Sequence, residues 1–277
     1  MTKPYAEVIG DPVAHSKSPT IHRFWLKRLG IEGDYAATRV AAEDLAAFFE
    51  SRRSSPDWRG CNVTLPHKQA VIPLLDRLTP MAAAVGAVNL ISVAEDGLVG
   101  GNSDVDGICN ALPTVAPGAL ERACLIGSGG AALAALAAFR AIGVQHLFLN
   151  VRNLAKGQAL LARSGMRGRV GPVDDSANLK EAQLIVNAST LGMAGQAAMP
   201  EGTLSAVRTI PDDAAIVFDM VYAPLETALL AAARARGLRT VDGLAMLVGQ
   251  AAASFHLFFG CPAPRVHDAE LRLSLTS

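Results

Sequence analysis

The sequence lacks the features that mark several classes of protein. Its formal charges balance, with 25 Lys and Arg residues against 25 Asp and Glu residues, so no charge excess predicts binding to nucleic acid or to an acidic membrane surface. The longest apolar stretch, residues 246–259, is interrupted by polar side chains and is too short and too polar to span a bilayer. The first residues form no apolar signal core. We therefore expect a globular, cytoplasmic protein with neither nucleic-acid nor membrane partners.

Cysteine is scarce and scattered along the chain. The four cysteines, at positions 61, 109, 124 and 261, form no Cys-x-x-Cys motif. They also have no metal-ligand spacing with the six histidines. This pattern predicts reduced, mostly buried thiols and no metal site.

A glycine-rich stretch in the middle of the chain predicts a dinucleotide site. An apolar run from Cys124 leads into a Gly-x-Gly-x-x-Ala turn, a helical segment to Ile142 and a second apolar run, which is the order of a βαβ unit. The first glycine suits a tight turn, and the second lets the backbone approach a pyrophosphate at the helix N-terminus. The alternative is a strand-to-helix turn without a ligand. The predicted cofactor-binding positions are Gly127, Ser128, Gly129, Gly130 and Ala131.

The end of the second strand of this unit indicates which dinucleotide is bound. An NAD site has Asp or Glu about 20 residues past the glycines, on the ribose hydroxyl. Here the chain has Arg152, and its next carboxylate is Asp174. A guanidinium suits a 2′-phosphate, so the sequence favours NADP. Alternatively, Arg152 is a solvated loop residue.

The first hundred residues contain two candidate sites. Ser18 before Pro19 has the form of a helix N-cap; alternatively, Ser16 and Ser18 bind a carboxylate at that helix N-terminus. After a buried strand, a helix is predicted from Pro66 to Leu74 or Leu78. Lys68 lies in its first turn, where the helix dipole disfavours a cation. It is therefore a candidate catalytic residue; alternatively, it is a solvent-exposed lysine.

Two aspartates follow the hairpin around Gly97. Asp104 and Asp106 are either a pair of catalytic carboxylates or part of an Asp- and Gly-rich turn. Beyond Arg152, strands alternate with helices, which predicts a parallel sheet covered on both faces. Polar residues follow two of these strands, from Asn187 and from Asp219, where open α/β sheets bind ligands.

Several blocks in order resemble the shikimate dehydrogenase family over nearly the whole chain. The blocks are Gly10 to Pro19, Gly60 to Lys68, Gly86 to Asn89, Gly101 to Asp104, Gly127 to Ala131, Asn187 to Met193, Asp219 to Tyr222 and Gly243 to Gln250. The resemblance implies an α/β fold of two domains with a cleft between them. Residues 1–107 with 243–277 would be the substrate-binding domain, and residues 108–242 a doubly wound Rossmann-type NADP domain entered through Pro113 to Gly118.

The resemblance also implies an activity: reversible NADPH-dependent reduction of 3-dehydroshikimate to shikimate, in aromatic amino acid biosynthesis. Lys68 matches the catalytic lysine, and proton transfer is assigned to the Lys68–Asp104 pair because a base must contact the reacting hydroxyl. The matched substrate positions are Ser16, Ser18, Thr64, Asn89, Asp104, Tyr222 and Gln250. Gly243 matches a position near the nicotinamide. The partner is a small molecule, and the chain is expected to be a monomer or homodimer.

Two departures and three alternatives accompany this resemblance. NADP-specific members usually have Asn-Arg-Thr where this chain has Val151-Arg152-Asn153, which predicts weaker discrimination against NAD. Ser103 replaces a usual threonine.

The nearest alternative is a degradative quinate/shikimate dehydrogenase using NAD or NADP. A methylenetetrahydrofolate dehydrogenase would lack the serine pair, and a non-enzymatic sensor would not need both Lys68 and Asp104.

Overall fold

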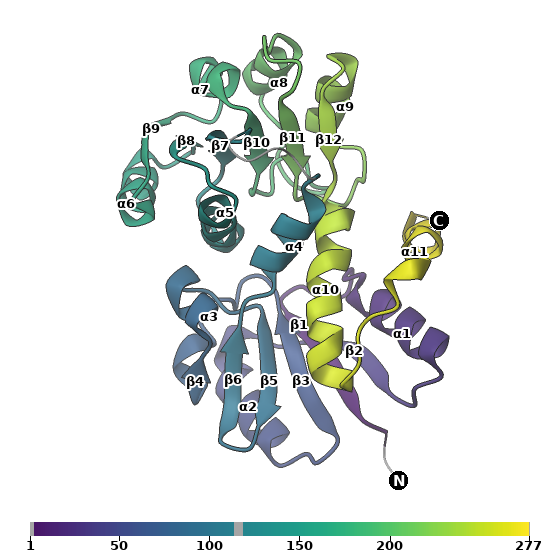
Figure 1. Ribbon diagram of the computed structural model, residues 1–277. Coiled ribbons are helices and arrows are strands. Elements are labelled where there is room, and N and C mark those ends of the chain that lie inside the picture. The colour runs from purple at the N-terminus through teal and green to yellow at the C-terminus, as the bar shows by residue number, and fades with distance from the viewer. Residues whose placement is uncertain (1–2, 114–118, 277) are drawn as a thin grey trace. The chain divides into compact units, whose positions relative to one another are not determined.

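The computed structural model describes residues 3–113 and 119–276, which divide into two compact α/β units (Figure 1). The first unit contains Met1–Gly107 and Leu247–Ser277, and the second contains Ile108–Met246. Residues 114–118 of the predicted Pro113 to Gly118 passage lie outside the described residues. No helix within the described ranges is long and apolar enough to cross a membrane.

The first unit is built on a six-stranded mixed sheet with the order β2-β1-β3-β5-β6-β4. Strands β2, β1 and β3 are parallel, whereas β5 is antiparallel to both β3 and β6. The strands are β1 Tyr5–Gly10, β2 Asp34–Arg39, β3 Trp58–Val63, β4 Arg77–Leu78, β5 Leu90–Ala94 and β6 Gly97–Gly101. The helices are α1 Ser18–Leu29, η1 Ala42–Asp44, α2 Leu45–Arg53, η2 Ile72–Leu74, α3 Pro80–Val85, η3 Arg265–His267 and α11 Asp268–Thr276. Two further helices, α4 Asp104–Ala111 and α10 Gly243–Phe259, have residues in both units.

Side chains of this sheet are buried on both faces because they alternate along each strand. On β1, Ala6 and Val8 pack with Phe258 of α10. Ile9 points to the other face and packs with Phe49 of α2. The sheet therefore lies between two helical layers, and polar residues that follow its strands are held by a rigid core.

The second unit is a six-stranded sheet with the order β12-β11-β10-β7-β8-β9, and all neighbouring strands are parallel. Helices α5 and α6 lie on one side of it and α7, α8 and α9 on the other (Figure 1). The strands are β7 Arg122–Ile126, β8 His146–Asn150, β9 Arg167–Gly171, β10 Leu184–Asn187, β11 Ile216–Asp219 and β12 Arg239–Val241. The helices are α5 Gly130–Ala141, α6 Leu154–Ser164, α7 Ser176–Glu181, α8 Glu201–Arg208 and α9 Ala228–Ala235. The predicted α/β class and the parallel, doubly covered sheet are confirmed.

The predicted helix from Pro66 to Leu74 or Leu78 is wrong. Residues 65–71 form successive turns, with Val71 N donating to His67 O at 3.1 Å, and only η2 follows. Pro73 has no N–H and disfavours a longer helix through this segment. The buried His67 ring also holds the turn in place, with Nε2 2.7 Å from Val40 O. Lys68 therefore lies in a turn, and the helix dipole gives no reason for its position.

The predicted role of Ser18 as an N-cap is also wrong. Ser18 is the first residue of α1, and the N-cap position is Lys17, whose side chain makes no capping bond. Instead, the Ser16 hydroxyl accepts a hydrogen bond from Ser18 N at 3.3 Å. The Ser18 side chain is thereby released from the capping role that its sequence context suggested.

Candidate active site

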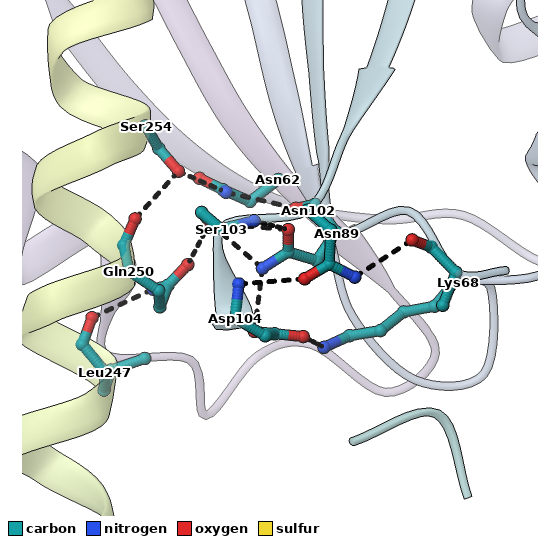
Figure 2. A network of polar contacts seen from close by, with 10 residues as sticks. Asn62, Lys68, Asn89, Asn102, Ser103, Asp104, Leu247, Gln250 and Ser254 are labelled. Atoms are coloured by element: carbon teal, nitrogen blue, oxygen red, sulfur yellow. Dashed lines mark hydrogen bonds and ion pairs between the residues drawn. The ribbon is translucent and has the colours of Figure 1, made fainter. Parts of the chain in front are cut away.

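Lys68 and Asp104 meet in the first unit. Lys68 follows β3 in the turn region, and Asp104 begins α4 directly after β6. The Lys68 Nζ atom lies 2.5 Å from Asp104 Oδ2, and the two side chains are 15% and 6% exposed. An ion pair this sheltered from water interacts more strongly than a surface pair. Figure 2 shows the pair at the edge of a larger polar network.

Asn89 holds the other oxygen of the same carboxylate. Its Nδ2 atom donates to Asp104 Oδ1 at 2.7 Å, and its Oδ1 atom accepts from Ser103 N at 2.7 Å. Asp104 N in turn donates to Asn102 Oδ1 at 3.0 Å. Because both ends of the Asn89 amide are used, the plane of the Asp104 carboxylate is fixed with one oxygen toward Lys68.

Helix α10 brings Gln250 to this network. The Ser103 hydroxyl donates to Gln250 Oε1 at 3.4 Å, and Gln250 Nε2 donates to Leu247 O at 2.9 Å. One turn later, the Ser254 hydroxyl accepts from Asn62 Nδ2 at 2.8 Å. Asn62 also donates to Asn89 O at 3.1 Å. The network therefore connects α10 with the ends of β3 and β6 (Figure 2).

Sequence reasoning did not assign a role to Asn62 or Ser254, although both are buried. The i, i+4 spacing of Gln250 and Ser254 places them on one helix face, and this spacing was available in the sequence. Tyr35 was also missed: its hydroxyl donates to Asn62 Oδ1 at 2.7 Å. Nothing local in β2 indicates that contact.

Ser16 and Thr64 lie on loops that leave the same end of the sheet, after the parallel neighbours β1 and β3, and Ser18 begins α1 directly after the first of these loops. The two loops are joined by main-chain hydrogen bonds, Asp11 N to Leu65 O at 3.1 Å and Thr64 N to Ile9 O at 2.9 Å. Among the described residues, the hydroxyls of Ser18 and Thr64 have no hydrogen-bond partner. They are therefore available to a ligand.

Asp106 does not join Asp104. It is exposed, whereas Asp104 is buried. Residues two apart on a helix point about 200° apart, so the hypothesis of an Asp104–Asp106 carboxylate pair is wrong.

In the second unit, the glycine-rich turn has the conformation that its sequence predicts. Gly127 has a φ of +114°, which L side chains rarely adopt. Gly129 is the N-cap of α5, and a Cβ atom built on it would meet nothing within 4 Å. A ligand can therefore approach the backbone of Gly129 closely, at a helix N-terminus where no side chain provides a cap.

Arg152 follows β8 and is exposed, with no partner for its guanidinium among the described residues. Next to it, Asn153 caps α6 by accepting from Lys156 N at 2.9 Å. The Asn at this position thus has a structural role, and Arg152 is free to bind a phosphate. An open backbone at Gly129 and an uncommitted guanidinium are what a phosphorylated dinucleotide requires.

Tyr222 and Gly243 lie in the second unit near the carboxyl edge of its sheet. Tyr222 follows β11, and burial raises the pKa of its hydroxyl. Gly243 begins α10, and a Cβ atom there would lie 2.3 Å from Met220 O. The glycine at position 243 is therefore required by the backbone of the Tyr222 loop.

Family models, curated relatives and solved structures match this chain. The family model described as the shikimate dehydrogenase substrate binding domain matches residues 8–91, and the one described as the shikimate 5'-dehydrogenase C-terminal domain matches residues 243–267. A shikimate dehydrogenase (NADP(+)) from Sphingopyxis alaskensis is 50% identical, over 99% of this chain and 97% of its own. A second, from Azorhizobium caulinodans, is 44% identical, over 96% and 93%. The crystal structure of shikimate 5-dehydrogenase from Thermus thermophilus in complex with NADP(H) and shikimate has a TM-score of 0.84 and 32% identity, covering 98% of this chain and 99% of that one.

Proposed function

Since the chain belongs to the shikimate dehydrogenase family, we propose that it catalyses the reversible NADPH-dependent reduction of 3-dehydroshikimate to shikimate. The observation that carries this proposal is the Lys68–Asp104 ion pair with its carboxylate held by Asn89. A dehydrogenase acting on a secondary alcohol needs a sheltered acid–base group, and this pair joins a lysine to a buried carboxylate.

The substrate is a small ring acid with several hydroxyl groups, and residues 1–107 with 243–277 would bind it. The hydroxyls of Ser16 and Ser18 would hold its carboxylate. The hydroxyl of Thr64 and the side chains of Asn89 and Gln250 would pair with the ring hydroxyls. Thr64 and Asn89 lie next to strand ends, Ser18 begins α1 and Gln250 is on α10, so these four groups are held by secondary structure.

Proton transfer is assigned to the Lys68–Asp104 pair. When the alcohol is oxidised, its hydroxyl proton leaves as the hydride leaves, so a base must contact that oxygen. Lys68 and Asp104 present a nitrogen and an oxygen 2.5 Å apart. As an ammonium–carboxylate pair they accept the proton on the Asp104 carboxylate, and Lys68 accepts it only as the neutral amine. In the reduction direction the same pair returns the proton to the forming alkoxide.

The cofactor would be bound by the second unit, at residues 108–242. When the alcohol is oxidised, bound NADP⁺ would be the hydride acceptor. The backbone of Gly127, Ser128, Gly129, Gly130 and Ala131 would bind the pyrophosphate at the start of α5, and Arg152 the 2′-phosphate. Tyr222 would face the substrate, and Gly243 would lie near the nicotinamide. The enzyme would act in the cytoplasm in aromatic amino acid biosynthesis, as a monomer or homodimer.

Initial rates with shikimate and with quinate, each against NADP⁺ and NAD⁺, test the proposal. We expect turnover with shikimate and NADP⁺ to exceed the other three combinations. Turnover of quinate, or equal use of NAD⁺, would instead indicate the degradative branch. No activity in any combination would refute the substrate assignment.

A further inference from the structure

Asp219, the last residue of β11, is a buried carboxylate that contacts three segments of the second unit. It has no exposed surface. Its Oδ2 atom accepts from Thr227 Oγ1 at 2.6 Å, and its Oδ1 atom accepts from Asn187 Nδ2 at 2.8 Å and Val221 N at 3.0 Å. Both oxygens are therefore used, and all three donors are neutral groups.

Asn187 extends this contact to the neighbouring strand. It is the register partner of Asp219 in the parallel pair of β10 and β11. Its Oδ1 atom accepts from Ser189 N at 3.1 Å and from the Ser189 hydroxyl at 2.7 Å, and its Nδ2 atom donates to Leu191 O at 3.1 Å. Asn187 O accepts from Met220 N at 3.0 Å. The loops that follow β10 and β11 are thus joined through one buried amide and one buried carboxylate.

These two loops carry or contact the positions proposed to bind ligands. The loop after β11 contains Tyr222, and its Met220 O and Val221 O atoms would lie 2.3 and 2.7 Å from a Cβ atom on Gly243. The loop after β10 packs against the glycine-rich turn, since a Cβ atom on Gly127 would lie 3.1 Å from the Ala188 backbone. A shift of the loop after β10 would therefore disturb the turn proposed to bind the pyrophosphate, and a shift of the loop after β11 would disturb Gly243, proposed to lie near the nicotinamide.

We infer that Asp219 is a positioning residue for catalysis: through Asn187, Val221 and Thr227 it fixes the two strand-end loops that hold Tyr222 and Gly243 in place. This inference rests on the proposed function for its kinetic consequence. Its structural part, the fixing of the loops, does not depend on which substrate the enzyme uses.

A carboxylate suits this position better than an amide. The Thr227 hydroxyl accepts from Leu230 N at 3.3 Å as the cap of α9, so its own proton needs an acceptor, which is Asp219 Oδ2. An Asn at position 219 keeps an oxygen for Val221 and Asn187 but turns an amide N–H₂ toward that hydroxyl. Burial raises the pKa of Asp219 to about 6, and the carboxylate is still mostly ionised in neutral and alkaline solution.

The test uses Asp219→Asn with the pair Thr227→Val and Thr227→Ser. Valine removes the hydroxyl at nearly constant volume, whereas serine keeps it. Ser164→Ala is the matched control, because the Ser164 side chain is buried and makes two hydrogen bonds, to Leu161 O and from Met166 N. That site precedes β9, at the opposite edge of the same parallel sheet. Each variant is measured for melting temperature, steady-state constants and hydrogen exchange of residues 188–192 and 220–224.

We expect Asp219→Asn and Thr227→Val to lower kcat/KM for shikimate by roughly tenfold or more, mainly through KM, because misplaced binding groups weaken catalysis. Hydrogen exchange should accelerate in both loops of these two variants. Thr227→Ser, which keeps the hydroxyl, should have kcat/KM and loop exchange close to those of the wild type. Ser164→Ala should lower the melting temperature by about 2–4 °C with unchanged kinetic constants and unchanged exchange in the loops.

Other outcomes would contradict the inference or the proposed function. If Asp219→Asn and Thr227→Val behave like Ser164→Ala, losing melting temperature alone, Asp219 is a structural residue and the inference is overturned. If the wild-type chain turns over no shikimate, the proposed function fails. Unchanged hydrogen exchange of the two loops in Asp219→Asn would separately show that Asp219 does not fix the loops.

Discussion

Lys68 and Asp104 form a sheltered ion pair across 36 residues of sequence, with Lys68 Nζ 2.5 Å from Asp104 Oδ2. Asn89 holds the second carboxylate oxygen. The pair is therefore oriented before any substrate arrives, and its removal has consequences for both chemistry and stability. Breaking a buried pair by deleting one partner leaves the other charge uncompensated.

We expect Lys68→Ala to lower kcat by about 10²-fold or more, the usual contribution of a positioned proton-transfer group. KM for shikimate should change much less. Steady-state rates at saturating NADP⁺ measure both constants, and the exposed Lys180→Ala is a control for loss of a positive charge. If KM rises steeply while kcat persists, Lys68 is a substrate clamp and the acid–base assignment is wrong.

Arg152→Ala should raise KM for NADP⁺ by roughly 10–100-fold, since a hydrogen bond to a charged group contributes about 1.5–3 kcal/mol. KM for NAD⁺, which has no 2′-phosphate, should be nearly unchanged. The exposed Arg163 of α6 supplies the matched control, Arg163→Ala. An equal rise for both dinucleotides would mean that Arg152 never contacts the 2′-phosphate.

The two glycines of the turn should respond differently to alanine. Gly127→Ala forces a φ of +114° on an L residue and brings its Cβ to 3.1 Å from the Ala188 backbone, so we expect a loss of about 1–3 kcal/mol of stability. Gly129 has a φ of −88° and open space at its Cβ. Gly129→Ala should therefore keep the melting temperature and raise KM for NADP⁺.

Thermal melts and NADP⁺ kinetics on the two variants check this pair. A Gly129→Ala variant with normal NADP⁺ kinetics would indicate that no pyrophosphate approaches that backbone.

His22 should make the fold sensitive to acid. Its ring is fully buried, stacks on Tyr35 at 3.9 Å between centroids, and has no hydrogen-bond partner for either nitrogen among the described residues. Burial lowers the pKa of His22 to about 3, from an ordinary value of 6.5. Below pH 6.5 the His22 ring is therefore protonated in the unfolded chain but stays neutral in the folded chain. The free energy of unfolding falls as pH falls from 6.5 toward 3.

The expected loss from His22 is about 2–3 kcal/mol between pH 6.5 and pH 4.5. Urea unfolding at several pH values measures it as the difference between wild type and His22→Phe, which does not titrate. The exposed His256, changed to Phe, is the control. Parallel pH curves for wild type and His22→Phe would contradict the buried, neutral state of this ring.

Local patterns predicted the first strands and helix of the second unit well. The run β7–α5–β8 lies close to its predicted bounds because apolar runs and a Gly-rich turn specify strand, turn and helix without distant contacts. Strand β9 was missed because its sequence, Arg-Gly-Arg-Val-Gly, is polar. It becomes a strand at the sheet edge because β8 offers main-chain partners. Helices α7 and α8 were also missed.

Prediction failed where distant groups determine a local conformation. The turns around Lys68 replace the expected helix because Pro73 disfavours it and the buried His67 ring meets Val40 O, 27 residues away. Ser18 proved to be a helical residue, since the Ser16 hydroxyl accepts its N–H. The predictions for Ser16, Ser18, Thr64, Tyr222 and Gln250 as ligand-binding residues stay predictions.

By itself, the sequence determined the α/β class, the parallel sheet and its glycine-rich turn, and the family, because each depends on residues close together in the chain or on blocks in a recognisable order. Only the tertiary structure decided that Asn89 orients the Asp104 carboxylate toward Lys68, that Asn62 and Ser254 join α10 to the network, and that Asp219 connects two loops. The hydrogen bonds that make these contacts form at about 3 Å between donor and acceptor atoms. Which side chains come within that distance is set by the packing of whole strands and helices, and no local pattern encodes it.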